Sequence, residues 1–154
     1  MATTSDLMSA AQLCANAADA AVDLLIGLGP RPSEAAGASA WDAQDTLLKN
    51  KISTLNNLSS AISALIVNDA LEGVWPALTD LDKVTDAAQK NIDAIKEISK
   101  AMAAVASVIN FGVAVATLAT QPTPGNAGSV ATAFRNMVNT FSGQSAASRP
   151  AGVK

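Results

Sequence analysis

The chain has 154 residues, of which 49% are hydrophobic and 15% charged, and its formal net charge is −3 at pH 7. This length predicts one domain with enough chain to bury a core, and the low charged fraction is typical of buried helices, oligomers or membrane-active proteins rather than of disordered chains. The acidic balance, the scattered basic residues and an aromatic content of 3% exclude nucleic-acid binding, which needs clustered Lys and Arg and stacking platforms.

A first helix is expected from about Asp6 to Leu28, followed by a Gly- and Pro-rich loop to about Ala40. Small and apolar residues recur alternately four and three positions apart, and such small residues let helix axes approach closely. The expected inward positions are Leu7, Ala11, Cys14, Ala18, Ala21, Leu25 and Leu28. Cys14 is the single cysteine, and we interpret it as a small apolar seam residue.

The amino-terminal residues lack a basic region followed by an apolar core, so no cleavable signal peptide is expected. The sequence therefore favours a soluble cytoplasmic or non-classically secreted protein, with possible membrane association.

A second helix is expected from near Asp42 to about Leu71, ended by Gly73 and Pro76. Trp75 lies between these two breakers, where it caps the end of the bundle or sits at an interface or membrane surface. The apolar stripe of this helix contains Leu48, Ile52, Leu55, Leu58, Ile62, Leu65 and Ile66.

The third pattern begins with Thr79 and Asp82, which resemble a capping box, and runs unbroken to about Thr120. It predicts one helix of about 40 residues, roughly 60 Å long, with Gly112 as the only bend. The inward positions of this helix are Leu81, Val84, Ala88, Ile92, Ile95, Ile98, Met102, Val105, Ile109 and Val113.

No ionisable side chain occurs between Ala101 and Phe134, and the first part of this stretch, Ala101 to Thr120, is long enough to span a bilayer as a helix. Such a segment must be hidden in a bundle, an oligomer or a membrane. The residues expected to insert or assemble are Met102, Val105, Val108, Ile109, Asn110, Phe111, Val113, Val115 and Leu118. Three lysines on the amino-terminal side, Lys90, Lys96 and Lys100, are expected to stay at the headgroup level.

Asn110 has two interpretations. Its amide needs hydrogen-bond partners, which the same residue of a neighbouring copy would supply in an assembly. Alternatively, it is a single satisfied Asn at the surface of the bundle.

A turn from Gln121 to Asn126 precedes a short fourth helix, which is expected to fold back along the apolar end of the third. The apolar face of this helix contains Val130, Phe134, Met137, Val138 and Phe141. The sequence thus predicts an all-α elongated bundle of three long helices and one short carboxyl-terminal helix. A single domain is expected over 1–141, with its apolar segment at 101–121, and a flexible tail over 142–154.

Catalytic chemistry is not indicated. The chain has no histidine, and it lacks phosphate-loop, nucleophile-elbow, paired-cysteine zinc and dinucleotide motifs. Carboxylates at i, i+4 spacing are interpreted as solvated helix faces, and these pairs are Asp19 with Asp23, Asp82 with Asp86, and Asp93 with Glu97. The sequence therefore predicts a non-enzymatic protein with no metal and no cofactor.

The segment KVTDAAQKNIDAIKEISK leading into AMAAVASVINFGVAVATLATQ, roughly residues 83 to 121, resembles the alpha-helical pore-forming toxins of the cytolysin A and haemolysin BL type. The resemblance implies a rod of packed helices that conceals an apolar part until it meets a membrane. This chain is about half the usual family length, and its apolar run has no second one in tandem, so the resemblance implies a small component or a truncated relative.

The preferred interpretation is a membrane-interacting protein of pore-forming type, whose partners are a lipid membrane or further copies of the chain, with a second protein component left open. An Ala-rich run partitions only marginally into lipid, which counts against it. The alternative is a structural or adaptor protein whose helices self-assemble into a soluble oligomer or filament. A carrier with an apolar ligand in its core is a third option.

Overall fold

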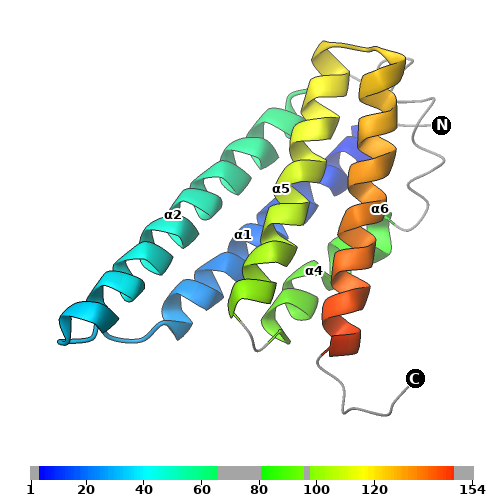
Figure 1. Cartoon of the computed structure of the whole chain (residues 1–154). Helices are drawn as coiled ribbons and strands as arrows, with labels where there is room; N and C mark the ends of the chain where they lie inside the picture. Colours follow the sequence, from blue (N-terminus) through cyan, green and yellow to red (C-terminus); the bar gives the residue numbers. More distant parts are fainter. Residues whose placement is uncertain (1–3, 66–80, 96–97, 148–154) are drawn as a thin grey trace.

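The computed structural model describes residues 4–65, 81–95 and 98–147, and within these ranges all regular secondary structure is helical (Figure 1). The described helices are α1 (Thr4–Gly27), α2 (Ala35–Ser63), α4 (Leu81–Asp93), α5 (Ile98–Thr120) and α6 (Pro124–Ala147). The prediction of an all-α helical bundle is confirmed. The predicted count of three long helices and one short one is wrong, because the described ranges contain five helices.

Helix α1 lies at the centre and packs against α2, α4 and α5. It does so through small side chains that are at most 2% exposed on several sides of the helix: Ala10, Ala11, Cys14, Ala17, Ala18, Ala20 and Ala21. Small residues allow three neighbours to approach one helix closely. The seam predicted for this helix is confirmed from Leu7 to Ala21, while Leu25 and Leu28 are half-buried against the core.

The connection between α1 and α2 is shorter than predicted, because α2 begins at Ala35 rather than near Asp42. Gly29 adopts a positive φ of 69°, which ends the turn after α1 and suits glycine. A Cβ at Gly37 would lie 3.1 Å from the Cβ of Pro32, so this glycine lets the loop pack on the first turn of α2. The side chain of Trp41 then donates to the carbonyl of Gly29 at 3.2 Å.

Helix α2 ends at Ser63, so the predicted continuation to Leu71 is wrong at Ala64 and Leu65. Leu48, Leu55 and Ile62 of the predicted stripe are fully buried. Residues 66–80, which include Trp75 and the proposed capping residue Thr79, lie outside the described residues.

The predicted 40-residue rod is wrong. Helix α4 ends at Asp93, Ala94 and Ile95 form a turn, and α5 begins at Ile98. A continuous rod of roughly 60 Å would extend well beyond α1, which is about 36 Å long, and would leave the apolar half uncovered. Ending α4 lets α5 pack back on α1 and α2 instead, and Gly112 lies inside the uninterrupted α5 rather than at a bend.

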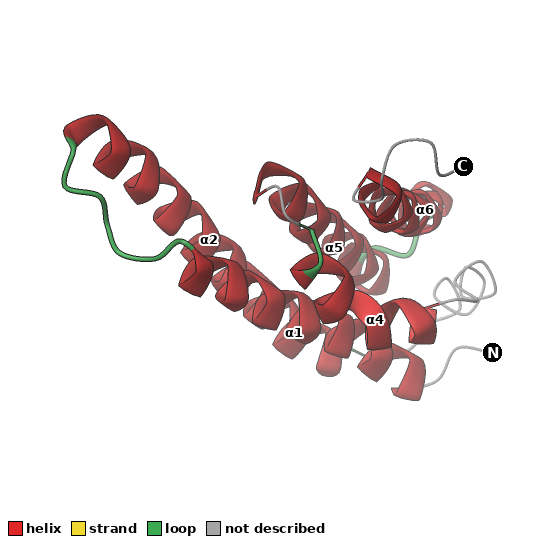
Figure 2. Ribbon diagram, turned by 90° about the horizontal axis from the view of Figure 1, so that it is seen from below, coloured by secondary structure: helices red, strands yellow, loops and turns green. Residues whose placement is uncertain are grey.

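Helices α2, α1 and α4 form one layer, and the antiparallel pair α5 and α6 lies over it (Figure 2). Helix α6 folds back along α5 as predicted, with Val130, Phe134, Met137 and Phe141 buried and Val138 half-buried. It is not short, however, since it has 24 residues and ends at Ala147.

Candidate functional site

Helix α5 is the one helix in the described ranges that is long and apolar enough to cross a membrane, with a mean hydropathy of 2.0 over its best window. Half of that window is buried inside the bundle, as in the core helices of many soluble proteins. Length and composition alone therefore leave both roles open.

The residues predicted to insert or assemble divide into two groups on α5. Five of them face the core and are fully buried: Val105, Val108, Phe111, Val115 and Leu118. Met102 and Ile109 are half-buried, whereas Asn110 is exposed and Val113 is 47% exposed. The predicted inward seam is wrong at Val113, which is exposed, whereas Met102 and Ile109 are half-buried and pack against the core.

Gly112 marks the closest approach of α5 to the other layer. A Cβ added there would lie 3.0 Å from Cys14 Sγ, 3.2 Å from Leu58 Cδ1 and 3.7 Å from Ile62 Cδ1. Any larger residue must displace α5 or these neighbours. Burial raises the pKa of the Cys14 thiol to about 12, so it acts as an apolar packing group.

The α5–α6 hairpin has its own internal contacts. The rings of Phe111 and Phe134 lie 5.6 Å apart, between centroids, with planes tilted by 55°. At the turn, the backbone N–H of Asn126 donates to Thr123 Oγ1 at 3.1 Å, which caps α6, and its side chain donates to the carbonyl of Gln121 at 2.7 Å. These contacts hold the two helices together independently of the other layer.

Polar contacts join α1 to α4. Ser9 Oγ donates to Asp82 Oδ1 at 2.7 Å, Asn16 Nδ2 to the carbonyl of Thr85 at 2.8 Å, and Thr85 Oγ1 to the carbonyl of Ser9 at 3.2 Å. These bonds fix the register of α4 along α1.

The hairpin meets the other layer differently. Leaving aside Lys100, Leu118 and Ala119, no described side chain of α5 or α6 forms a hydrogen bond or ion pair with α1, α2 or α4. Apart from those three residues, the described side chains make this contact by apolar packing, which is non-directional.

A second carboxyl contact between α1 and α4 was missed by sequence reasoning, which placed Asp23 and Asp93 in separate solvated pairs. The two carboxyls share a hydrogen bond, and Gln89 Nε2 donates to Asp23 Oδ2 at 3.2 Å. Desolvation, the hydrogen bond to Asp23 and the repulsion between the two groups raise the pKa of Asp93 to about 6. Spacing within one helix could not indicate this pair, since the partners lie 70 residues apart.

The outer side of the hairpin carries a shallow hollow of about 320 Å³ between α5 and α6. It is lined by Ala103, Ala106, Ser107, Asn110, Ala133, Asn136 and Thr140. Asn110 thus lies at the surface of the bundle, and within the described part of the chain its carboxamide has no hydrogen-bond partner. Pairing of Asn110 between copies stays a prediction.

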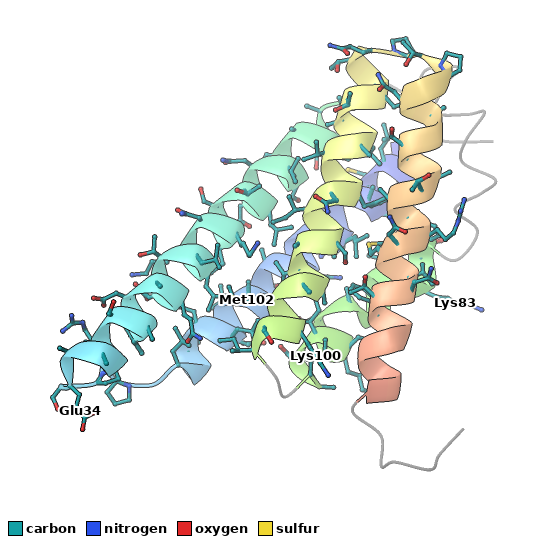
Figure 3. The ribbon with its side chains drawn as sticks, in the orientation of Figure 1. Glu34, Lys83, Lys100 and Met102 are labelled. Atoms are coloured by element: carbon teal, nitrogen blue, oxygen red, sulfur yellow. The ribbon has the colours of Figure 1, made fainter. Side chains whose placement is uncertain are left out.

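The three predicted anchors do not lie on one helix. Lys90 is exposed in the last turn of α4, Lys100 is half-buried in the first turn of α5, and Lys96 lies outside the described residues. Lys100 and Met102 mark the amino-terminal end of α5, far from Glu34 at the tip of α2 (Figure 3). Among the described residues, no group of three or more His, Cys, Asp or Glu is placed to hold a metal ion.

Comparisons with models of protein families, with curated proteins and with solved structures find no match. Function is therefore inferred from the geometry of the hairpin.

Proposed function

We propose that this is a non-enzymatic, membrane-interacting protein of pore-forming type, in which the α5–α6 hairpin moves from the bundle to a bilayer. The observation that carries the proposal is that a helix of bilayer length, with no ionisable side chain after Lys100, lies against the other layer mainly through apolar side chains. In the bundle α5 is concealed, and in the membrane-bound state its residues from Met102 to Leu118 insert or line an assembly.

The energetics favour transfer between two apolar environments over release into water. Fully exposing a buried Val, Leu or Phe costs about 1.5–3 kcal/mol, so exposing the five core residues of α5 costs roughly 10 kcal/mol. This is comparable to the whole stability of a typical domain, ~5–15 kcal/mol. The hairpin therefore stays docked in water, and a bilayer offsets the loss because it accepts the same side chains.

The native Cys14 offers a direct test through the single substitution Gly112→Cys. The new Cβ would lie 3.0 Å from Cys14 Sγ, about the separation that a disulfide with an S–S bond of ~2.04 Å requires. Oxidation during refolding is the suitable route, because the raised pKa of the buried Cys14 keeps its thiol unreactive in the folded protein. The bridge would tie α5 to α1.

The oxidised variant is expected to release no dye from liposomes and not to float with lipid, and reduction is expected to restore both. Gly128→Cys is the matched control, because a Cβ at Gly128 has no neighbour within 4 Å and no bridge to Cys14 of the same chain can form. Equal leakage by the oxidised and reduced Gly112→Cys protein would show that α5 need not leave α1. Absence of leakage and flotation for the unmodified protein at any pH would refute the membrane function itself.

The second candidate function is a structural or adaptor protein that self-assembles into a soluble oligomer or filament. The exposed side of α5 favours it, because Val113 is 47% exposed and the neighbouring surface positions Ala103 and Asn110 are uncharged. A stable oligomer that forms at low concentration and is indifferent to lipid, measured by light scattering, would select this function.

A further inference from the structure

Acidic residues occur in the part of the chain that contains α1, α2 and α4 and are absent from the part that contains α5 and α6. All 13 acidic residues lie at or before Glu97, so the segment that contains α5 and α6 has no Asp or Glu. The same segment carries four basic residues, of which Lys100 and Arg135 belong to the described helices and Arg149 and Lys154 lie outside the described residues.

The acidic side chains of the other layer are at the surface. Asp19 and Asp23 on α1, and Asp82, Asp86 and Asp93 on α4, are all exposed. On the hairpin, by contrast, the exposed positions include Asn110, Val113, Arg135 and Asn136. The described residues of the hairpin thus include no acidic side chain. Residues 46–63 of α2 also lack one and carry Lys49 and Lys51, but within the described ranges only the hairpin contains an apolar helix of bilayer length.

We propose that the outer face of the α5–α6 hairpin is the surface on which this protein meets an anionic lipid bilayer. This inference rests on the proposed function and names the class of lipid. It also assigns an orientation, with α5 and α6 toward the membrane and α1, α2 and α4 away from it.

A chain with a net charge of −3 can bind an anionic surface if its acidic side chains lie far from the lipid. In this orientation a layer of helices, about 10 Å thick, separates the acidic layer from the lipid. The Debye length is about 10 Å at 0.1 M salt, so the acidic side chains are largely screened while Arg135 on the outer layer is not. Each basic side chain near an anionic membrane surface strengthens binding about fivefold.

The test is vesicle binding by the full chain, measured by flotation on phosphatidylcholine vesicles with and without phosphatidylglycerol. At about 0.1 M salt, binding to the anionic vesicles is expected to be at least about fivefold stronger, and about 1 M salt is expected to remove the difference. Equal binding to both kinds of vesicle at about 0.1 M salt would overturn the lipid assignment and leave the proposed function standing. Binding to neither would refute the proposed function.

Two variants with the same chemical change locate the surface. Asn136→Asp adds the first carboxylate to the hairpin, and Asn56→Asp adds one to the exposed side of α2. Asn136→Asp is expected to weaken binding to anionic vesicles by about fivefold, while Asn56→Asp changes it little. Equal losses for the two variants would refute the orientation.

A second copy of the chain is the competing partner, since its acidic layer also complements the hairpin. Sedimentation without vesicles distinguishes the two. A dimer at low salt that Asn136→Asp dissociates would assign the face to self-association and overturn the lipid proposal, whereas a monomer under the same conditions supports it.

Discussion

The close packing at Gly112 gives a quantitative prediction for the substitution Gly112→Ala. Replacing a helical glycine by alanine gains about 0.5–1 kcal/mol from the backbone. At this position the new methyl group would lie 3.0 Å from Cys14 Sγ and 3.2 Å from Leu58 Cδ1, and overpacking of this kind costs about 1–3 kcal/mol. The net change is a loss of unfolding free energy of roughly 0–2.5 kcal/mol.

Gly128→Ala in α6 separates packing from helix propensity. Its Cβ meets nothing within 4 Å, so this variant is expected to be stabilised by about 0.5–1 kcal/mol. The difference between the two variants, measured by urea unfolding, is expected to be about 1–3 kcal/mol in favour of Gly128→Ala. Equal shifts would refute the close approach of α5 to α1.

Cys14→Ala adds a double-mutant cycle to the same experiment. Removal of the sulfur opens room for the methyl group at position 112, so the double variant is expected to be more stable than the sum of the single changes predicts. The coupling is expected to be about 1 kcal/mol, well above the ~0.3–0.5 kcal/mol scatter of independent sites. A coupling within that scatter would mean that Leu58, not the sulfur of Cys14, opposes the substitution.

Three further predictions concern the Asp93 carboxyl, the Phe134 ring and the exposed side of α5. The pKa of Asp93 is raised to about 6, so protonation of this carboxyl stabilises the folded protein below about pH 4, and this stabilisation is lost as the pH rises through 6. In urea unfolding at a series of pH values, Asp93→Asn is expected to show a flatter decline in stability than the wild type. Parallel curves for the two proteins would exclude the contact with Asp23. Phe134→Ala is expected to lower the unfolding free energy by about 3–5 kcal/mol, since the ring is 7% exposed, and a loss below 1 kcal/mol would contradict its packing on α5. Val113→Asp, at a position 47% exposed, is expected to leave the fold intact by circular dichroism and to abolish liposome leakage, because a charge near the centre of an inserted helix costs about 3 kcal/mol. Val108→Asp, at a fully buried position, is expected to unfold the bundle. Unchanged leakage by Val113→Asp would refute insertion of α5.

Sequence periodicity determined the class of structure and several of its faces. Small residues alternating four and three positions apart placed Leu7, Cys14 and Ala21 in a buried seam, and the Gly- and Pro-rich turns placed the end of α1 and the reversal before α6. The prediction for the apolar face of α6 was also correct, because an amphipathic helix with one apolar stripe can bury only that stripe.

Two features were decided by tertiary structure alone. The chain between Thr79 and Thr120 has no proline and no glycine before Gly112, so its helical pattern gave no reason for the turn at Ala94 and Ile95. After Lys100, α5 has no charged side chain, so its sequence does not indicate which residues face the core. Val113 is exposed and Phe111 buried because α1, α2 and α6 surround one part of that helix, and the gain from burying it outweighs the local preference for an unbroken rod.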